Sequence, residues 1–310
     1  MKLQDESSGP EYSFRDFFWD VWDNKVGITA VGALFAITSI LIALAIPDKY
    51  TSNAILAPKS RDGASGGLGQ LASDYGGLAS LAGISLGGLG DVREVEIAIE
   101  TVKSRTFFAK YMYKDFVKAI MASKSWDRSN QELILDDSLF DSIDGKWVRD
   151  EESVVPTVQE THRVFIEQVV RIREDADSGL VLMSATHHSP VVAFRIVEKV
   201  IAGIDDAIRQ SDVQEAEKAI EFLEAQIEKN SLVSLDEVFA QLIEEQTKTI
   251  MLANASREYV FQTIEPPVIS EEKSLPKRSL IAILGTMLGL FVGVLAVLLR
   301  RVVVFSRAPS

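Results

Sequence analysis

The chain has 310 residues, a formal net charge of −13 and no cysteine. The missing cysteines exclude a disulfide framework, cysteine-based zinc sites and thiol catalysis, and the acidic balance argues against a nucleic-acid partner. Residues 1–25 and 300–310 together carry six acidic and six basic side chains, so the whole net charge of −13 belongs to residues 47–278.

Residues 1–25 are predicted to form a tail that contains a short interfacial helix. Apolar side chains recur there at helical spacing, and Ser13 is placed to cap the first turn; they are Phe14, Phe17, Phe18, Val21 and Trp22. We expect this aromatic face to rest in the headgroup boundary of a membrane. Packing of the same face against another protein is the alternative.

Two uncharged apolar runs of 21 residues, 26–46 and 279–299, lie near opposite ends of the chain. At about 1.5 Å rise per residue, each reaches about 31 Å as a helix, enough to cross a hydrocarbon core of about 30 Å. A cleaved secretory signal is the alternative for the first run. Its apolar core is longer than such signals have, and no small-residue cleavage site follows it. We therefore predict two transmembrane helices that enclose a domain of residues 47–278.

The charge of the tails predicts the topology. An even number of spans puts both tails on one side, where they hold six basic residues, and long loops are exported largely regardless of charge. The sequence thus predicts a two-span protein of a bacterial inner membrane. Both termini, 1–25 and 300–310, are expected in the cytoplasm and the main domain in the periplasm.

Two strands are predicted close to the two spans. Residues 49–57 have the alternating, β-branched character of a strand ended by Pro58, and residues 258–265 form a second strand stopped by Pro266 and Pro267. Because each lies near a span, we expect the two strands to pair and to join the start and end of the domain.

The segment 63–90 contains ten glycines in 28 residues. It lacks the Gly-x4-Gly-Lys-Ser/Thr pattern of a phosphate-binding loop and the strand-turn-helix context that a nucleotide fold needs. Leucine and isoleucine side chains between the glycines instead favour a pliable loop that folds onto a neighbouring surface.

The rest of the domain reads as helices with a few strands. A helix is predicted over 91–111, followed by a region of mixed character to about Gly145, and a hairpin over 169–173 and 180–186. Three short strands with long helices predict an α+β domain.

The longest helical pattern in the chain begins at Ser189-Pro190, a cap followed by a first-turn proline. Apolar steps of three and four continue to Asn230, with an interruption near residues 210–212. Ser234-Leu-Asp-Glu237 has capping-box spacing and is predicted to start a second helix, so that residues 190–256 form a protruding helical hairpin. A single longer rod is the alternative, because neither glycine nor proline enforces the turn.

Taken together, these features resemble the polysaccharide co-polymerases, and the closest branch is the Wzz-type chain-length determinant. The resemblance rests on the two terminal spans, the strand at Tyr50, the Gly-rich segment, Ser189-Pro190 and the closing run from Tyr259 to Pro267, which is followed by Lys277-Arg278. It covers essentially the whole chain.

This resemblance implies a non-enzymatic regulator of surface polysaccharide chain length, such as that of the O-antigen of lipopolysaccharide. It implies a ring homo-oligomer that acts with a Wzy-type polymerase on an undecaprenyl-linked glycan. The sequence departs from the usual pattern of this family in two respects. The proline-rich segment before the second span holds only Pro266, Pro267 and Pro276, and no kinase follows that span.

The residues that we expect to matter most lie in the spans. Gly285, Gly289 and Gly293 form two overlapping Gly-x3-Gly steps on one face of the second span, and Gly32 and Ala36 offer a matching small pair in the first. Small residues let helix backbones approach closely in a membrane. By resemblance, coupling to the polymerase is expected in this region.

No catalytic, cofactor-binding or metal-binding residue is predicted. The adjacent His187 and His188 are interpreted as a surface feature beside the Ser189 cap, since no metalloprotease arrangement is present, and His162 stands apart from them. Paired carboxylates, Asp136-Asp137 and Asp205-Asp206, are interpreted as solvated charges.

Two rival classes complete the interpretation. A two-span sensor or receptor would also display a periplasmic helical domain, but the short tails leave little room for an output module. A periplasmic glycan-acting enzyme is disfavoured by the missing site constellation. Membrane lipids are an expected partner in every case.

Overall fold

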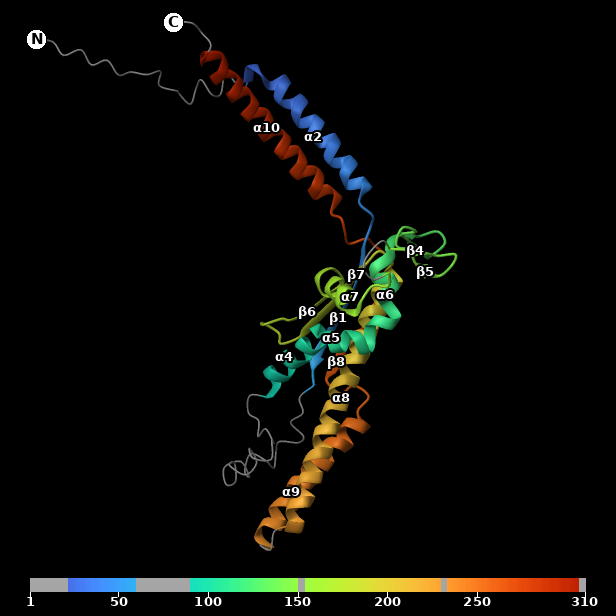
Figure 1. The fold of residues 1–310 in the computed structure, drawn as a ribbon. Coiled ribbons are helices and arrows are strands. Elements are labelled where there is room, and N and C mark those ends of the chain that lie inside the picture. Colours follow the sequence, from blue (N-terminus) through green and yellow to red (C-terminus); the bar gives the residue numbers. More distant parts are fainter. Residues whose placement is uncertain (1–21, 60–89, 150–153, 230–232, 307–310) are drawn as a thin grey trace, which may run out of the picture. The chain divides into compact units, whose positions relative to one another are not determined.

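A computed structural model describes residues 22–59, 90–149, 154–229 and 233–306, and the chain divides into two compact units (Figure 1). The helix-pair unit comprises residues 1–48 and 274–310, and the mixed unit comprises residues 49–273. The predicted aromatic helix before the first span and the Gly-rich segment fall outside the described residues, apart from their last few positions.

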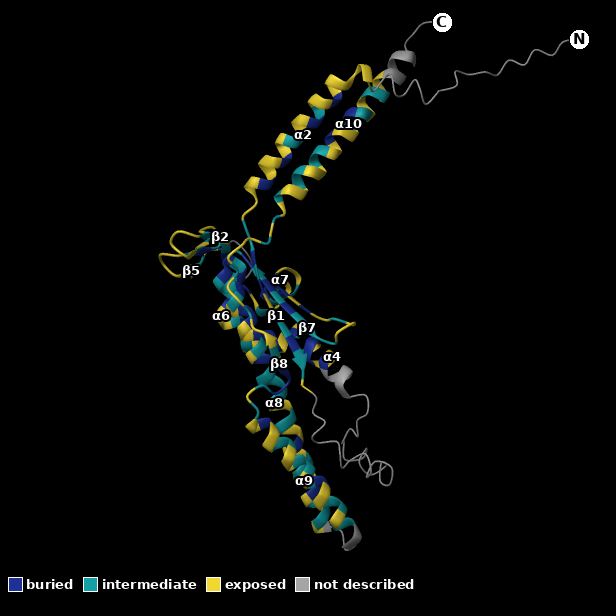
Figure 2. Cartoon of the chain, turned by 180° about the vertical axis from the view of Figure 1, so that it is seen from behind, coloured by how far each residue is buried: buried dark blue, intermediate teal, exposed yellow. Residues whose placement is uncertain are grey.

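The helix-pair unit consists of α2 (Lys25–Ala45) and α10 (Arg278–Ser306), which run side by side (Figure 1). Both helices are built almost wholly from apolar residues, and their outer faces are exposed (Figure 2). Each is long and apolar enough to cross a membrane, over Lys25–Ala45 and Arg278–Arg300. A helix that is apolar on all sides is typical of a membrane span.

The mixed unit is organised around one antiparallel sheet of four strands in the order β6-β7-β1-β8. These strands are β6 (Val170–Glu174), β7 (Val181–His187), β1 (Tyr50–Pro58) and β8 (Phe261–Glu265). The predicted pairing of the strands near the two spans is confirmed, because β1 pairs with β8 from Ile55 opposite Glu265 to Pro58 opposite Phe261. The predicted hairpin is confirmed too, because β6 pairs with β7.

Residues alternate strictly between the two faces of the central strands. In β7, residues 181, 183, 185 and 187 are buried and the residues between them are half-buried, and β1 buries alternate residues from Tyr50 to Leu56. This period of two places one face of the sheet against the helices. The helix that contacts both central strands is α8 (Pro190–Lys229).

A helical segment covers the rest of this core. It comprises α4 (Gly90–Lys103), α5 (Arg105–Phe107), the π-helix η1 (Phe108–Met112) and α6 (Tyr113–Ala122). The predicted helix over 91–111 is therefore wrong in two respects. It breaks at Ser104, whose side chain accepts a hydrogen bond from the Phe107 amide, and it then continues to Ala122. A second helix, α7 (Val158–Val164), ends in the π-helix η2 (Phe165–Val169), and the Phe108 and Phe165 rings lie 4.9 Å apart.

Two small hairpins occupy the region that was expected to be mixed. The first joins β2 (Ser123–Asp127) to β3 (Glu132–Leu135), and the second joins β4 (Phe140–Asp141) to β5 (Lys146–Trp147). We call residues 123–148 the β2–β5 lobe. The four strand ranges predicted from the sequence correspond to β1, β6, β7 and β8, whereas the short strands β2 to β5 were not predicted.

The predicted helical hairpin is confirmed. After 40 residues, α8 is followed by α9 (Val233–Ala255), which packs along it (Figure 1). The apolar spacing is interrupted near residues 210–212, yet α8 continues through them without a break. The second helix begins at Val233, one residue before the predicted cap at Ser234. The expected α+β architecture with a long helix and two apolar terminal helices is thus confirmed.

Candidate functional site

The contact face between α2 and α10 is made of small residues. Ile28, Gly32, Ser39 and Ala43 are the buried positions of α2, and they recur at steps of four, seven and four. Such a stripe lets two helix backbones approach more closely than larger side chains would allow.

The glycines of α10 all face this stripe. A Cβ atom added at Gly289 would lie 2.5 Å from the Phe35 Cβ, and one added at Gly293 would lie 3.2 Å from the Ile28 Cα. At Gly285 an added Cβ would collide with the Ser39 side chain. All three positions therefore leave no room for a side chain unless α2 shifts.

On α2, the two residues of the predicted small pair differ. A Cβ added at Gly32 would lie 2.7 Å from the Leu290 Cδ2, so Gly32 lies in the contact face. Ala36 is half-buried at its margin. The structure thus places four of the five predicted residues against the opposite helix, and their role inside a membrane stays a prediction.

Sequence reasoning missed Ser39, a buried polar residue of the contact face. Its hydroxyl lies 3.3 Å from the carbonyl oxygen of Ile281 on α10 and 3.4 Å from that of Ala36 on its own helix. Hydroxyl side chains commonly form hydrogen bonds between helices in a membrane. The spacing of Ser39 seven residues after Gly32 was the available signal.

An ion pair joins the chain just after the C-terminus of α2 to the N-terminus of α10. Arg278, the first residue of α10, places its guanidinium 2.8 Å from the carboxylate of Asp48, three residues after α2 ends. Each side chain is about one-third exposed, so the bond is partly screened by solvent.

The three prolines of the predicted proline-rich segment are divided between the two units. Pro266 and Pro267 directly follow β8, where they cannot donate to a sheet ladder and therefore end the strand. The chain after them is held by the buried Ser52 hydroxyl, which donates to the Val268 carbonyl at 2.8 Å. Pro276 belongs to the helix-pair unit instead, two residues before α10.

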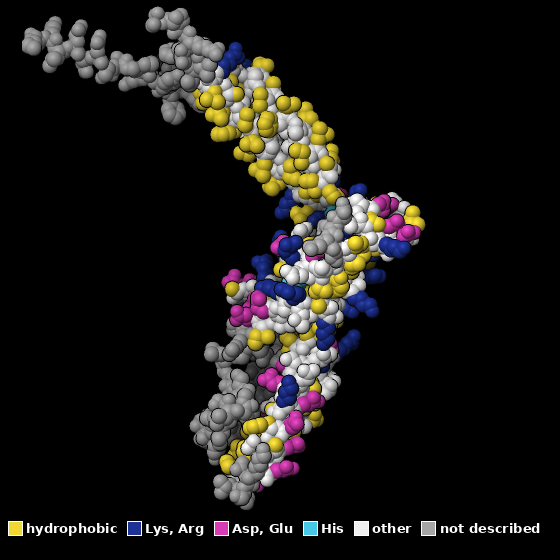
Figure 3. Space-filling model, in the orientation of Figure 1, with side chains coloured by type: hydrophobic (Ala, Val, Ile, Leu, Met, Phe, Trp, Pro, Cys, Tyr) yellow, Lys and Arg dark blue, Asp and Glu magenta, His cyan; other side chains and the backbone are white. Residues whose placement is uncertain are grey.

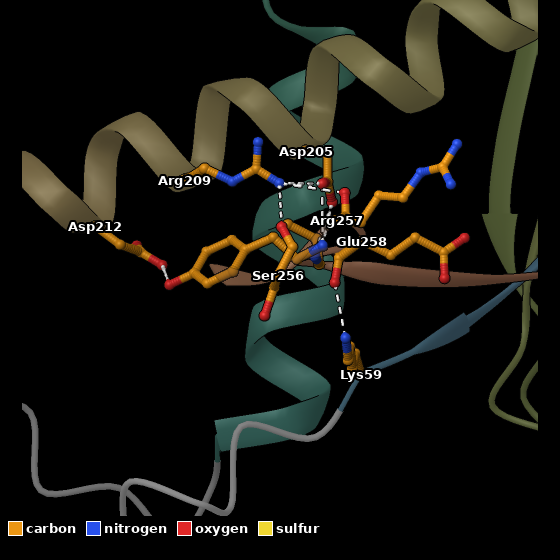
Figure 4. Close-up of polar contacts among 9 residues, drawn as sticks. Lys59, Asp205, Arg209, Asp212, Ser256, Arg257 and Glu258 are labelled. Atoms are coloured by element: carbon orange, nitrogen blue, oxygen red, sulfur yellow. Dashed lines mark hydrogen bonds and ion pairs between the residues drawn. The ribbon is translucent and has the colours of Figure 1, made fainter. Parts of the chain in front are cut away.

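A cluster of polar side chains fixes the middle of α8 to the chain that enters β8 (Figure 4). The Asp205 carboxylate accepts hydrogen bonds from the amides of Tyr259 and Val260, at 2.9 and 2.8 Å, and pairs with Arg209 at 2.8 Å. Arg209 also donates to the Ser256 carbonyl at 3.1 Å. We call this group the Asp205 anchor.

The anchor corrects the interpretation of Asp205 and Asp206 as solvated charges. The Asp205 side chain is only 14% exposed and holds two backbone amides. Asp206 accepts hydrogen bonds from the Tyr111 hydroxyl and the Gln210 amide, at 2.8 and 2.9 Å. Partial burial is the main cause that raises the pKa of Tyr111 above its ordinary value. Asp136, by contrast, caps a turn through Ser138, whose hydrogen bonds lower the pKa of that carboxyl.

His187 is not the surface residue that we expected. It is 3% exposed, its Nδ1 accepts from the Ser189 amide at 3.0 Å, and its Nε2 donates to the Ala119 carbonyl at 2.9 Å. Burial lowers the pKa of His187 to about 4. The ring therefore ties the end of β7 to α6 and stands beside Ser189, whose hydroxyl caps α8 through the Val192 amide.

The other histidines also serve structural contacts. His188 is half-buried with its ring 6.0 Å from that of His187, and His162 donates to the Lys103 carbonyl at 2.8 Å. Within the described ranges, no three histidine, aspartate or glutamate side chains come together in a way that could hold a metal ion.

Two family models match the chain. Residues 10–114 match the model described as Wzz, "Chain length determinant protein", and residues 229–302 match GNVR, "G-rich domain on putative tyrosine kinase". No curated protein matches the sequence.

Two solved structures match the chain, both with TM-scores below 0.5. A "full-length bacterial polysaccharide co-polymerase" superposes with a TM-score of 0.45 and 12% identity, over 96% of this chain and all of that one. A "Fragment of WzzB, Polysaccharide Co-polymerase from Salmonella Typhimurium" superposes with a TM-score of 0.29 and 11% identity, over 74% of this chain and all of the fragment.

Proposed function

This chain belongs to the Wzz-type polysaccharide co-polymerases, which regulate polysaccharide chain length, and we propose that it does so without catalysis, as a ring homo-oligomer in a bacterial inner membrane. Its partner is a Wzy-type polymerase that extends an undecaprenyl-linked glycan. The product is the O-antigen of lipopolysaccharide or a related surface glycan.

One observation carries this proposal. Apolar helices from both ends of the chain pack on each other through glycines, and the chain between them folds as a separate mixed unit. Such an arrangement suits a protein that is held in a membrane at both ends. Spans at residues 26–46 and 279–299 then divide two cytoplasmic tails, 1–25 and 300–310, from a periplasmic domain of residues 47–278.

Exposed apolar side chains on the helical hairpin support self-association. Phe222 on α8 and Met251 and Leu252 on α9 are 48, 65 and 42% exposed. Identical subunits placed side by side would cover such residues, and closed rings are a common result of one repeated interface. The ring would then present the polymerase with adjacent helix pairs, one from each subunit.

The absence of catalysis is part of the proposal. The polar clusters of the described residues are explained by structural contacts: the Asp205 anchor holds backbone amides, and His187 holds the α6 carbonyl of Ala119. Regulation through assembly requires no reacting group.

Deletion of the gene and electrophoresis of the surface polysaccharide test the proposal. We expect the modal cluster of chain lengths to disappear while polymer is still made, and a plasmid copy to restore it. Complete loss of polymer would instead indicate a synthetic enzyme. An unchanged band pattern would favour a sensor or receptor.

Assembly is tested separately on the purified chain in detergent. Mass photometry should find one oligomer of several subunits, and Phe222→Asp or Met251→Asp should shift it toward monomers. A matched substitution at an exposed polar site of the same hairpin, Glu244→Gln, should leave the oligomer unchanged. A wild-type chain that is monomeric at all concentrations would refute the ring.

A further inference from the structure

The two edges of the central sheet carry opposite charges. Among the described strands, β6 and β8 each have a paired strand on one side only. The β6 strand presents Arg171 and Arg173, and both side chains are exposed. Residues 261–272, which comprise β8 and the chain after it, hold three acidic side chains and no basic one. We call residues 170–174 the β6 edge and residues 261–272 the β8 edge.

Arg173 and Glu265 lie at opposite ends of one row across the sheet. Arg173 is opposite Leu182 on β7, and Leu182 is opposite Ile55 on β1. Ile55 is in turn opposite Glu265 on β8. With strands about 4.8 Å apart, three spacings separate Arg173 from Glu265 by about 14 Å. Neither of these two side chains forms an ion pair with another described residue, so both charges are available to a partner.

The β8 edge also exposes apolar side chains. Ile264, Val268 and Ile269 are 55, 59 and 50% exposed. Ile264 is the extra residue of a bulge in β8, where the register with β1 shifts. Three large apolar side chains that lie within six residues and are each at least half exposed favour a protein contact at this edge.

The backbone of the β8 edge is poorly suited to accept an added strand. Pro266 and Pro267 have no amide hydrogen to donate, and the bulge at Ile264 disturbs the spacing of a ladder. The Thr263 amide already donates to the Glu258 carboxylate at 3.2 Å. A contact at this edge therefore depends on side chains.

We propose that the β8 edge of one copy of this chain packs against the β6 edge of the next copy, so that Glu265 meets the arginine pair of its neighbour. The inference rests on the self-association proposed above and names the surfaces that carry it. Each strand from β6 to β8 runs antiparallel to its neighbour, so a β6 edge placed beside a β8 edge continues the alternation. The neighbour would also cover the exposed apolar side chains of the β8 edge.

The edge charges select a head-to-tail arrangement. Two copies related by a two-fold axis would bring two acidic β8 edges together, or two β6 edges with their arginines. Head-to-tail packing joins opposite charges instead, and repulsion in the alternative arrangement adds to its specificity. A two-fold contact ends at a dimer, whereas a repeated head-to-tail contact closes into a ring when its rotation permits.

Cross-linking between copies tests the contact on the full-length chain in detergent. Arg173→Cys and Glu265→Cys are combined in one otherwise cysteine-free chain and treated with a short bis-maleimide. We expect a ladder of covalent dimers, trimers and larger products in denaturing electrophoresis. The matched control combines Glu265→Cys with Asp177→Cys, which is exposed in the β6–β7 turn, four residues beyond the row. At about 3.3 Å per residue the control cysteine is displaced by about 13 Å, so linking should fall about fivefold or more.

Charge reversal tests the pairing without a cross-linker. Arg173→Glu and Glu265→Arg should each raise the dissociation constant of the contact about fivefold, as mass photometry over a dilution series would measure. The double variant should restore the wild-type oligomer, which damage to the fold would not do. Asp177→Arg changes the charge outside the row and should leave the oligomer unchanged.

The remaining outcomes separate this inference from the proposed function. A wild-type chain that forms oligomers, yet shows neither cross-linking in the row nor an effect of charge reversal, overturns this contact and leaves the ring. Equal linking of the two cysteine pairs indicates random collision, and linked products that stop at two copies indicate two-fold pairing. Either result overturns the head-to-tail contact. A chain that is monomeric at all concentrations refutes the ring as well.

Discussion

Asp205 connects three backbone segments through one carboxylate. It stands on α8, receives the amides of Tyr259 and Val260 before β8, and pairs with Arg209, which in turn binds the carbonyl that ends α9. A charged acceptor makes stronger hydrogen bonds than a neutral one. The junction between the helical hairpin and the sheet therefore depends on this residue.

Asp205→Asn should destabilise the mixed unit by about 2 kcal/mol, because it removes the charge that two amides and a guanidinium share. Urea unfolding of the full-length chain in detergent, followed by circular dichroism, measures the change. Asp137→Asn, at an exposed position in the β2–β5 lobe, is the matched control and should change stability by less than about 0.5 kcal/mol. Equal stability of Asp205→Asn and wild type would show that the anchor is redundant.

His187 should make the stability of the mixed unit depend on pH. Its pKa is about 4 in the folded chain against 6.5 when unfolded, so the unfolded chain binds more protons between these values. The stabilisation that neutral His187 provides is complete above pH 6.5 and is lost as the pH falls toward 4. Because one pKa unit corresponds to about 1.36 kcal/mol, the difference between the two pKa values amounts to a loss of about 3 kcal/mol in the free energy of unfolding.

The unfolding of wild type and of His187→Gln is measured at several pH values. Because the carboxylates titrate in both proteins, the difference in stability between the two isolates the effect of His187 protonation. The stability difference between the two should shrink by about 3 kcal/mol from pH 7 to pH 4. Curves that stay parallel over this range would contradict the assignment. The variant retains a donor toward the Ala119 carbonyl, which limits its disturbance of the fold.

At the scale of elements, the packing of α2 on α10 depends on the absence of side chains. Gly289 lies against Phe35 and against the backbone of Gly32, so any larger residue must separate the helices. The outer faces of both helices carry large exposed apolar side chains (Figure 3).

Gly289→Leu should reduce the pairing of α2 with α10 about tenfold, which corresponds to about 1.4 kcal/mol. A cysteine pair at Ser39 and Ile281, whose hydroxyl and carbonyl oxygen lie 3.3 Å apart across the two helices, reports the pairing as oxidative cross-linking within one otherwise cysteine-free chain in membranes. Met287→Leu, at a 63% exposed position of α10, should not change the yield. An unaltered yield of cross-linked chain in Gly289→Leu would show that the packing of α2 on α10 does not depend on this glycine.

For the whole molecule, the decisive property is its orientation in the membrane. Both tails are expected in the cytoplasm and residues 47–278 in the periplasm, because the tails hold the basic residues and long loops are exported regardless of charge. The glycan chemistry proposed above would take place on the periplasmic side, and the mixed unit is therefore expected on that side.

A membrane-impermeant maleimide should label Glu244→Cys, at an exposed site of the hairpin, in cells whose outer membrane alone is permeabilised. Ser310→Cys should react only after the inner membrane is broken. Labelling of Ser310→Cys in intact spheroplasts, or protection of Glu244→Cys, would reverse the topology. The wild-type chain provides an unlabelled background, since it has no cysteine.

Much of the architecture follows from local patterns in the sequence. The apolar runs, the strands beside Tyr50 and Tyr259, the 169–186 hairpin and the helix that starts at Ser189 each have a period or a cap that identifies them. Hydrophobic periodicity and turn chemistry act over a few residues, and they therefore survive in any tertiary context. The small stripe of α10 was visible for the same reason.

Only the tertiary structure decided which polar residues are buried and what they bind. Asp205 and His187 look like ordinary surface residues in the sequence, because their partners are backbone groups 54 and 68 residues away. The β2–β5 lobe was missed since its strands are too short to show a period. Local pattern fixes an element, whereas burial depends on contacts between distant segments that no single stretch of sequence encodes.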